Sequence, residues 1–195
     1  MFYLIIIFVS VILVGLGNLI FSLPVSVNDV LAVYFAVILG AVVAFLLDAI
    51  SAFAIRRMTP KKWYLPSRKI FKVSKKERNF YRALKIKAWK DKIPELGGFT
   101  SFHKDKLESQ SDAEYLERFI VEANYGVVIH IANALLGALV VFIPFCSSPS
   151  IWIPVFVVNF ILSLLPVAVL RYTSYTLQNL HSRCVKRTQE RRPYE

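Results

Sequence analysis

Apolar positions along the chain fall into four long blocks that are separated by polar segments. Residues 2–23 contain no charged side chain, and residues 30–55 contain only Asp48. Two further blocks cover residues 125–146 and 151–172. A helix needs about 20 apolar residues to cross the hydrocarbon core of a bilayer, and each block is long enough for one crossing. The pattern therefore predicts an all-α integral membrane protein with four transmembrane helices.

Short turns are predicted between the first and second blocks and between the third and fourth. Pro24 ends the first helix, and Asn28 and Asp29 are residue types that begin the next one. A Ser-Ser-Pro-Ser segment at residues 147–150 separates the last two blocks. The first block is expected to be a retained helix rather than a signal peptide, because it has no Lys or Arg and its apolar run is too long.

The composition supports a membrane protein and excludes two other classes. Hydrophobic residues make up 56% of the 195 positions and charged residues 19%, whereas soluble domains have roughly 45–50% and about 25%. The excess lies in uncharged blocks, which excludes a soluble single-domain enzyme, and the same numbers exclude a disordered chain. The two cysteines, Cys146 and Cys184, fall at opposite ends of a predicted span and are not expected to pair. No Cys/His spacing predicts a metal site.

Positive charge indicates the topology. Residues 56–124 carry 18 of the 24 Lys and Arg side chains, residues 171–195 carry the other six, and the two short turns carry none. Cytoplasmic segments of membrane proteins are enriched in Lys and Arg, so both termini and the central loop are predicted to be cytoplasmic. The expected organisation is a multi-pass protein of the cell membrane. Its parts are helices 1 and 2 (1–55), a basic loop (56–124), helices 3 and 4 (125–172) and a basic tail (173–195).

The central loop interleaves basic and aromatic residues over positions 61–88, for example at Trp63 and Phe80. Such a pattern occurs in grooves that bind single-stranded nucleic acid, and beside a membrane it marks segments that lie in the interface and meet anionic headgroups. The flanking spans favour the membrane, and no nucleic acid partner is expected. Ser111 and Glu114 form a capping box that predicts an amphipathic helix leading into the third span.

Polar residues inside the spans are candidates for function, because ionisable groups in a membrane are costly. Asp48 and His130 each lie one to two turns inside the cytoplasmic end of their block, so we expect them at one depth. The imidazole of His130 is suited to act as a general base. Asn133, Asn159 and Ser163 are compatible either with function or with plain helix packing.

Several motifs follow one another in a familiar order. Residues 86–94 read Ile-Lys-Ala-Trp-Lys-Asp-Lys-Ile-Pro, Glu122 precedes His130 with seven residues between them, and an Arg171-Tyr172 pair is followed by Leu177. Over about residues 60–180 this order resembles the glycosyl-4,4'-diaponeurosporenoate acyltransferase family of staphyloxanthin biosynthesis. The resemblance rests on the order and spacing of the motifs together.

This resemblance implies a membrane O-acyltransferase that moves a fatty acyl group from a thioester to a sugar hydroxyl of a membrane glycolipid or glycosylated carotenoid. The expected co-substrate is acyl-CoA or an acyl carrier protein, without a further cofactor, and membrane lipids are the surrounding partners. The alternatives are a non-catalytic membrane scaffold and a lipid-binding accessory protein. We expect one cleft at the cytoplasmic leaflet, with catalytic residues His130, Glu122 and Asp48 and substrate-binding residues Trp89, Lys90, Lys92, Asn133 and Arg171.

Overall fold

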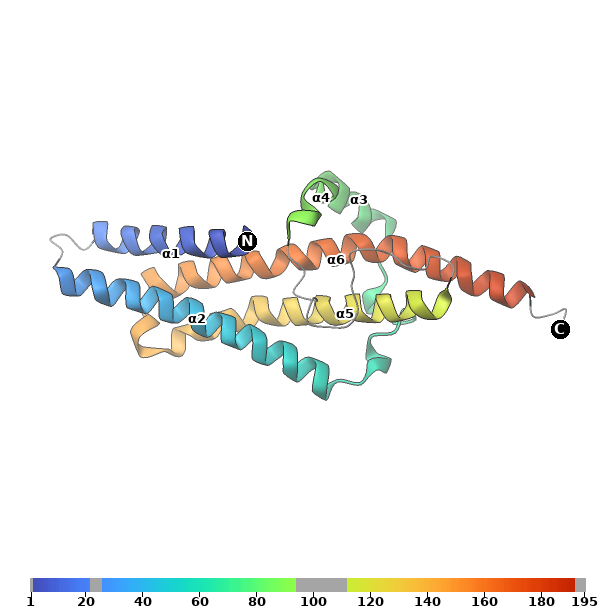
Figure 1. The fold of residues 1–195 in the computed structure, drawn as a ribbon, viewed down its shortest axis with the longest axis horizontal. Helices are drawn as coiled ribbons and strands as arrows, with labels where there is room; N and C mark the ends of the chain where they lie inside the picture. The colour runs from blue at the N-terminus through green and yellow to red at the C-terminus, as the bar shows by residue number, and fades with distance from the viewer. Residues whose placement is uncertain (1, 22–25, 94–111, 192–195) are drawn as a thin grey trace. The chain divides into compact units, whose positions relative to one another are not determined.

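The structure, a computed structural model, describes residues 2–21, 26–93 and 112–191, and every regular element in these ranges is helical. The second helix begins at Val27, and the predicted Asp29 lies in its first turn, where its carboxylate accepts hydrogen bonds from the backbone N–H and hydroxyl of Ser26. The α-helices are α1 (Phe2–Phe21), α2 (Val27–Met58), α3 (Lys75–Ala83), α4 (Ile86–Trp89), α5 (Ala113–Leu136) and α6 (Pro149–Arg191) (Figure 1). Short 3-10 helices are η1 (Lys61–Trp63), η2 (Lys69–Phe71), η3 (Lys90–Lys92), η5 (Gly137–Phe142) and η6 (Pro144–Cys146).

Among the described residues, three helices are long and apolar enough to cross a membrane. They are α2, the run from Ala113 to Phe142 formed by α5 and η5, and α6. These three confirm a helical membrane protein, and the remaining apolar helix, α1, is 20 residues long. The predicted fourth span and basic tail form one continuous helix, α6, which reaches Arg191.

The third span differs from the expected plain helix in two places. The predicted cap Ser111 lies outside the described residues. The next residue, Asp112, caps the start of α5. Its carboxylate accepts hydrogen bonds from the backbone N–H groups of Glu114 and Tyr115 at 2.9 and 3.2 Å. At its other end the α-helix tightens to a 3-10 helix from Gly137 onward. Glycine is a poor helix former, so this residue is a natural place for the change.

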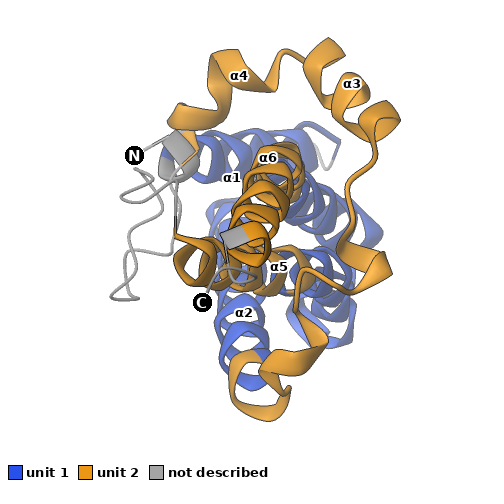
Figure 2. Cartoon of the chain, turned by 90° about the vertical axis from the view of Figure 1, so that its right-hand side faces the viewer, with its two compact units in different colours: residues 1–55, 129–165 blue, residues 56–128, 166–195 orange. Residues whose placement is uncertain are grey.

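The chain divides into two compact units, drawn in different colours in Figure 2. Unit 1 contains residues 1–55 and 129–165, and unit 2 contains residues 56–128 and 166–195. All 24 Lys and Arg residues belong to unit 2, whereas the only Asp or Glu residues in unit 1 are Asp29 and Asp48. The division by packing therefore coincides with the division by charge that the sequence shows.

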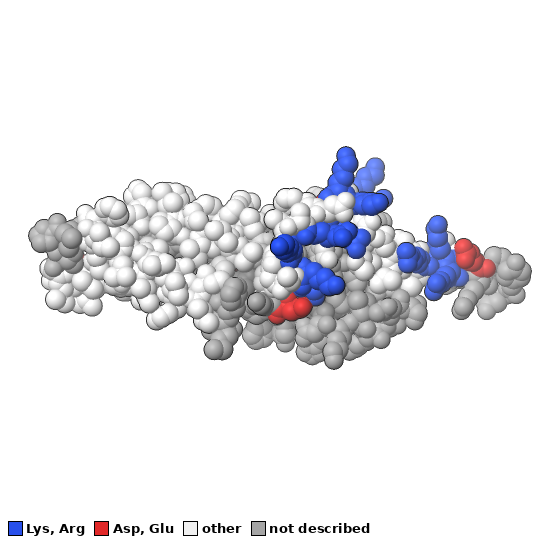
Figure 3. All heavy atoms as spheres, turned by 90° about the horizontal axis from the view of Figure 1, so that it is seen from above, with Lys and Arg blue, Asp and Glu red and all other residues white. Residues whose placement is uncertain are grey.

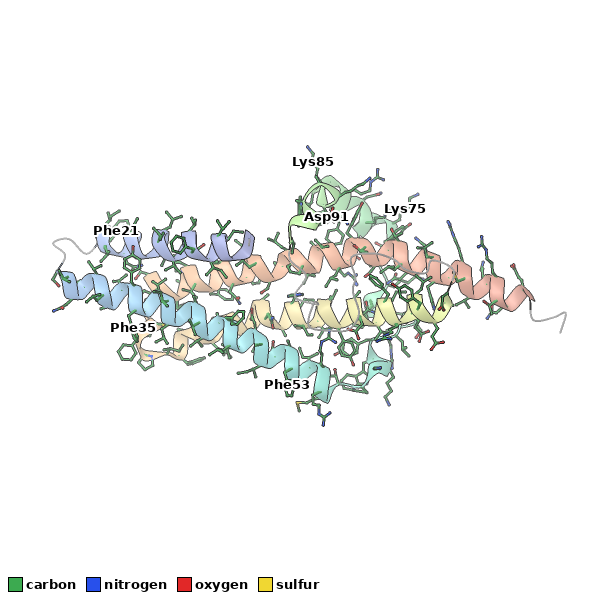
Figure 4. The ribbon with its side chains drawn as sticks, in the orientation of Figure 1. Phe21, Phe35, Phe53, Lys75, Lys85 and Asp91 are labelled. Atoms are coloured by element: carbon green, nitrogen blue, oxygen red, sulfur yellow. The ribbon has the colours of Figure 1, made fainter. Side chains whose placement is uncertain are left out.

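Unit 1 combines close helix packing with an apolar exterior. Gly40 of α2 lies where a Cβ atom would come within 3.3 Å of Val140, so the absence of a side chain permits the close approach. The Cys146 thiol donates a hydrogen bond to a carbonyl of α2 at 3.2 Å. Phe35 and Phe53 of α2 point outward and are 57% and 74% exposed (Figure 4). A surface of this kind is suited to lipid rather than to water.

Candidate active site

In unit 2 a segment that we call the belt, residues 59–93, first packs against α5. The buried amide of Asn124 donates a hydrogen bond to the carbonyl oxygen of Tyr64 at 2.7 Å. The ring of Tyr64 stacks on that of Tyr125, with 3.7 Å between centroids. The Tyr125 hydroxyl donates to the carbonyl oxygen of Thr59 at 3.0 Å. These contacts attach the first part of the belt to α5.

Glu122 of α5 is engaged by a cation. The Arg56 guanidinium donates to its carboxylate at 2.9 Å, and the Glu122 side chain is 18% exposed. The same guanidinium lies 5.7 Å from the centroid of the Tyr125 ring. Glu122, expected at the catalytic centre, thus joins the end of α2 to α5 in this structure.

The middle of the belt packs against α6 through two polar side chains. The Arg171 guanidinium donates two hydrogen bonds, each 2.8 Å long, to the two carboxylate oxygens of Glu77. It also donates to the carbonyl oxygen of Phe71 at 3.2 Å. Gln178 donates to that carbonyl at 2.8 Å and accepts from the backbone N–H of Val73 at 3.1 Å. Arg171, expected to bind substrate, therefore uses its donors to hold the belt.

Helix α3 presents one of its faces to α6. The Arg78 guanidinium lies over the ring of Tyr175, 4.6 Å from its centroid. Tyr81, one turn further along α3, lies on the same side, and burial, followed by the neighbouring Glu77 carboxylate, raises the pKa of its hydroxyl. These residues account for the inward face of α3 and leave its other face exposed.

The tryptophan–lysine motif lies in α4 and η3, directly after a turn of unusual geometry. Lys85 has a φ angle of 52°, in the left-handed region that residues with a side chain rarely adopt. The Trp89 indole N–H donates to the carbonyl oxygen of Leu84 at 3.0 Å. An indole has a single N–H donor, so Trp89 uses it to close this turn. Trp89, expected to bind substrate, thus uses its N–H donor within the belt in this structure.

A small pocket brings the motif together with both long helices of unit 2. Lys90 forms an ion pair with the adjacent Asp91 at 2.8 Å, while the Lys92 side chain is outside those described. The cavity volume is about 80 Å³, and its walls are apolar apart from the ion pair and one threonine. The lining residues are Lys90 and Asp91 of the belt, Phe119 and Ala123 of α5, and Val169, Leu170, Thr173 and Leu177 of α6.

In unit 1, polar side chains connect α2, α5 and α6. The buried Ser51 hydroxyl contacts the side-chain oxygen of Asn133 and also donates to the carbonyl oxygen of Asp48 at 2.9 Å. The Asn159 amide donates to the Asn133 backbone carbonyl at 3.0 Å. Of the two interpretations of Asn133 and Asn159, these contacts favour helix packing.

The register of α2 and α5 separates Asp48 from His130. The two helices run antiparallel (Figure 1), and Ser51 meets Asn133. Asp48 and His130 lie three residues before these partners, on opposite sides of the contact, and therefore about 9 Å apart along the helix axes. Asp48 and His130 therefore do not lie at the same depth. The prediction measured each residue from the end of its own hydrophobic block, and the ends of two such blocks need not coincide in depth. The buried Oδ1 atom of Asp48 has no hydrogen-bond partner among the described residues.

Helix α5 carries two of the pocket residues, Phe119 and Ala123, and also Glu122 and His130. Phe119, Ala123 and Glu122 belong to unit 2, and His130 belongs to unit 1. In the described part of the chain, no group of three or more His, Cys, Asp or Glu side chains is placed to hold a metal ion.

Comparison with known proteins assigns the chain to a family. The sequence profile of glycosyl-4,4'-diaponeurosporenoate acyltransferases matches residues 60–183, well over half of the chain. The matched stretch contains the belt motif with Trp89 and Lys90, the Glu122–His130 pair of α5, and Arg171 of α6. No curated protein and no solved structure matches the chain. The chain belongs to the glycosyl-4,4'-diaponeurosporenoate acyltransferase family and is, at the level of that family, an acyltransferase.

Proposed function

We propose that this protein transfers a fatty acyl group from a thioester donor to a sugar hydroxyl of a membrane glycolipid or glycosylated carotenoid. The hydroxyl oxygen attacks the thioester carbonyl, an ester C–O bond forms, the C–S bond breaks, and the thiol leaves with the proton. The observation that carries the proposal is the family match, which covers the tryptophan–lysine motif, Glu122 and His130. The same chain has helices that are long and apolar enough to span a membrane.

His130 is the general base in this proposal. Its imidazole takes the proton of the attacking hydroxyl and passes it to the departing thiolate, so the histidine returns to its starting state. The residue lies on a helix that enters the apolar part of the chain, where a lipid-linked sugar would be presented. Glu122, paired with Arg56, has a positioning role at the start of that helix.

The donor is proposed to bind at Lys90. Acyl-CoA and the prosthetic group of acyl carrier proteins both carry phosphate at one end of a pantetheine arm and the acyl chain at the other end. The Lys90 ammonium, at the edge of the pocket, supplies the positive charge that would attract this phosphate. Trp89 has a positioning role, because its hydrogen bond to the preceding turn fixes the backbone that carries Lys90.

The proposed topology places α1 as a fourth span, with both termini in the cytoplasm. The two native cysteines are buried, so single cysteines introduced at exposed sites report the topology. A membrane-impermeant thiol reagent added outside intact cells should label Ser148→Cys and leave Lys76→Cys unlabelled. Labelling of Lys76→Cys from outside would show that the belt faces the other side.

Replacement of His130 tests the catalytic proposal. The purified full-length protein in nanodiscs is supplied with radiolabelled acyl-CoA and a glucosyl lipid, and the acylated product is measured by mass spectrometry. Loss of a general base lowers rates by roughly 10²–10⁴-fold, so His130→Ala should be that much slower. His181→Ala is the matched control. His181 belongs to unit 2, where it lies 3.8 Å from Glu117. More than about a tenth of wild-type activity in His130→Ala would exclude the role, and an inactive wild-type protein would favour a scaffold or accessory function.

A further inference from the structure

The belt has an inner face that packs and an outer face that does not. Five apolar side chains along it are buried, and they are Tyr64, Phe71, Val73, Ile86 and Ile93. Four other large apolar side chains along the same segment point outward, and they are Trp63 at 52% exposure, Ile70 at 79%, Phe80 at 60% and Leu84 at 48%. The contacts with α5 and α6 hold the belt in place, so these side chains stay exposed. An exposed apolar surface of this kind marks a site that a membrane or a partner covers.

The outer face is also strongly basic. The belt contains 13 Lys and Arg residues and only two acids, Glu77 and Asp91. Each acid is already paired with a cation, Glu77 with Arg171 and Asp91 with Lys90. Lys75 and Lys85 extend away from α6 (Figure 4), and Lys and Arg atoms gather on unit 2 in the space-filling view (Figure 3). The charges on the exterior of the belt are therefore almost all positive.

We propose that the belt binds the headgroups of anionic phospholipids at the cytoplasmic membrane surface. Its four exposed apolar side chains enter the boundary between headgroups and acyl chains, while the lysines and arginines meet the phosphates. Apolar burial and attraction to anionic lipid together hold interfacial segments, and each Lys or Arg near such a surface strengthens the attraction. The inference is independent of which acceptor the enzyme acylates.

The distribution of the exposed apolar residues favours lipid over an acidic protein as the occupant. They occur in η1, in η2, in α3 and directly after α3, so they are distributed over residues 63–84 of the belt. A protein partner would require one contiguous patch of about 800 Å². The belt also begins one residue after Met58, the last residue of a membrane-spanning helix and 79% exposed.

A fluorescent label on the outer face tests the proposal without using acyl transfer. Phe80→Cys in the full-length protein is labelled with an environment-sensitive dye and placed in nanodiscs of phosphatidylcholine, with or without about a third of phosphatidylglycerol. Aqueous iodide should quench the label at least threefold less in the anionic nanodiscs, and high salt should reverse part of the difference. A label at Ser182→Cys on the exposed part of α6 should respond equally to iodide in both nanodiscs.

Charge reversal provides the matched pair of variants. Lys75→Glu/Lys76→Glu in the belt should remove most of the protection of the Phe80 label in anionic nanodiscs. Lys186→Glu/Arg187→Glu makes the same change in charge on α6 and should leave the protection intact. Equal quenching of the Phe80 label in both lipid compositions would overturn the proposal. Protection that appears only after an acidic carrier protein is added would also overturn it.

Discussion

Replacing Arg171 with alanine should release the belt from α6. The substitution removes two hydrogen bonds of 2.8 Å to Glu77 and two longer ones of 3.2 and 3.4 Å to backbone carbonyls. It also leaves the Glu77 carboxylate, only 26% exposed, without its cation. A hydrogen bond to a charged group contributes about 1.5–3 kcal/mol, and removal of one partner from a buried pair costs about 3–5 kcal/mol.

Because both side chains keep some contact with solvent, we expect a loss at the lower end of this range, about 3 kcal/mol. Each 1.4 kcal/mol is a factor of ten, so the belt should open about 100-fold more often. Arg171→Lys keeps the charge but loses the paired geometry, and it should increase opening about tenfold. The belt should open less often in the double variant Arg171→Ala/Glu77→Ala than in Arg171→Ala, because the double variant leaves no carboxylate without its cation.

Limited trypsin digestion of the nanodisc-embedded protein measures this opening. When opening and closing are fast relative to cleavage, the cleavage rate follows the population of the open state. Cleavage at the belt lysines is compared with cleavage at Lys186 and Arg187, which serve as an internal control on α6. If Arg171→Ala is cut in the belt within about threefold of the wild-type rate, the pair does not hold the belt. Additive effects of the two substitutions would show that the side chains are not coupled.

Three further predictions concern the turn at Lys85, the tryptophan that closes it, and Gly137. Lys85→Val should destabilise the left-handed turn by about 1–3 kcal/mol, whereas Lys85→Asn should preserve it. Trp89→Phe removes the N–H that closes the turn, and it should raise the KM for acyl-CoA more than it lowers kcat. Gly137→Ala should lower the Tm of the purified protein, because its Cβ would lie within 3.1 Å of the Cγ atom of Asn159. Gly17→Ala, whose Cβ would meet nothing within 4 Å, is the control and should leave the Tm nearly unchanged.

Local properties of the sequence predicted the elements of this protein well. Uninterrupted apolar blocks require helices in a bilayer, since backbone groups there must bond within their own segment. Three described helices that are long and apolar enough to cross a membrane, which are α2, the run formed by α5 and η5, and α6, confirm that part of the prediction. The separation of charge along the chain reappears as a separation between two packed units.

Partner choice was less accessible from the sequence. The carboxylate bound by Arg171 is 94 positions away in the chain, and the cation bound by Glu122 is 66 positions away. Such pairs depend on how the belt folds back, which neither spacing nor charge determines. A usable signal did exist at Asn124, a polar residue four positions after Ile120 and therefore on the apolar face of its helix. Asn124 and Gln178 both hold backbone groups of the belt.

The continuity of α6 restricts how the length of this protein can vary during evolution. Arg171 and Gln178 both bond the belt, from positions seven residues apart on one helix. A single inserted residue between them would rotate one contact by about 100° relative to the other. Deletions and insertions should therefore be absent from this stretch in related sequences, even where the side chains between the two positions differ freely. Changes in length should collect in the turn before α6 instead.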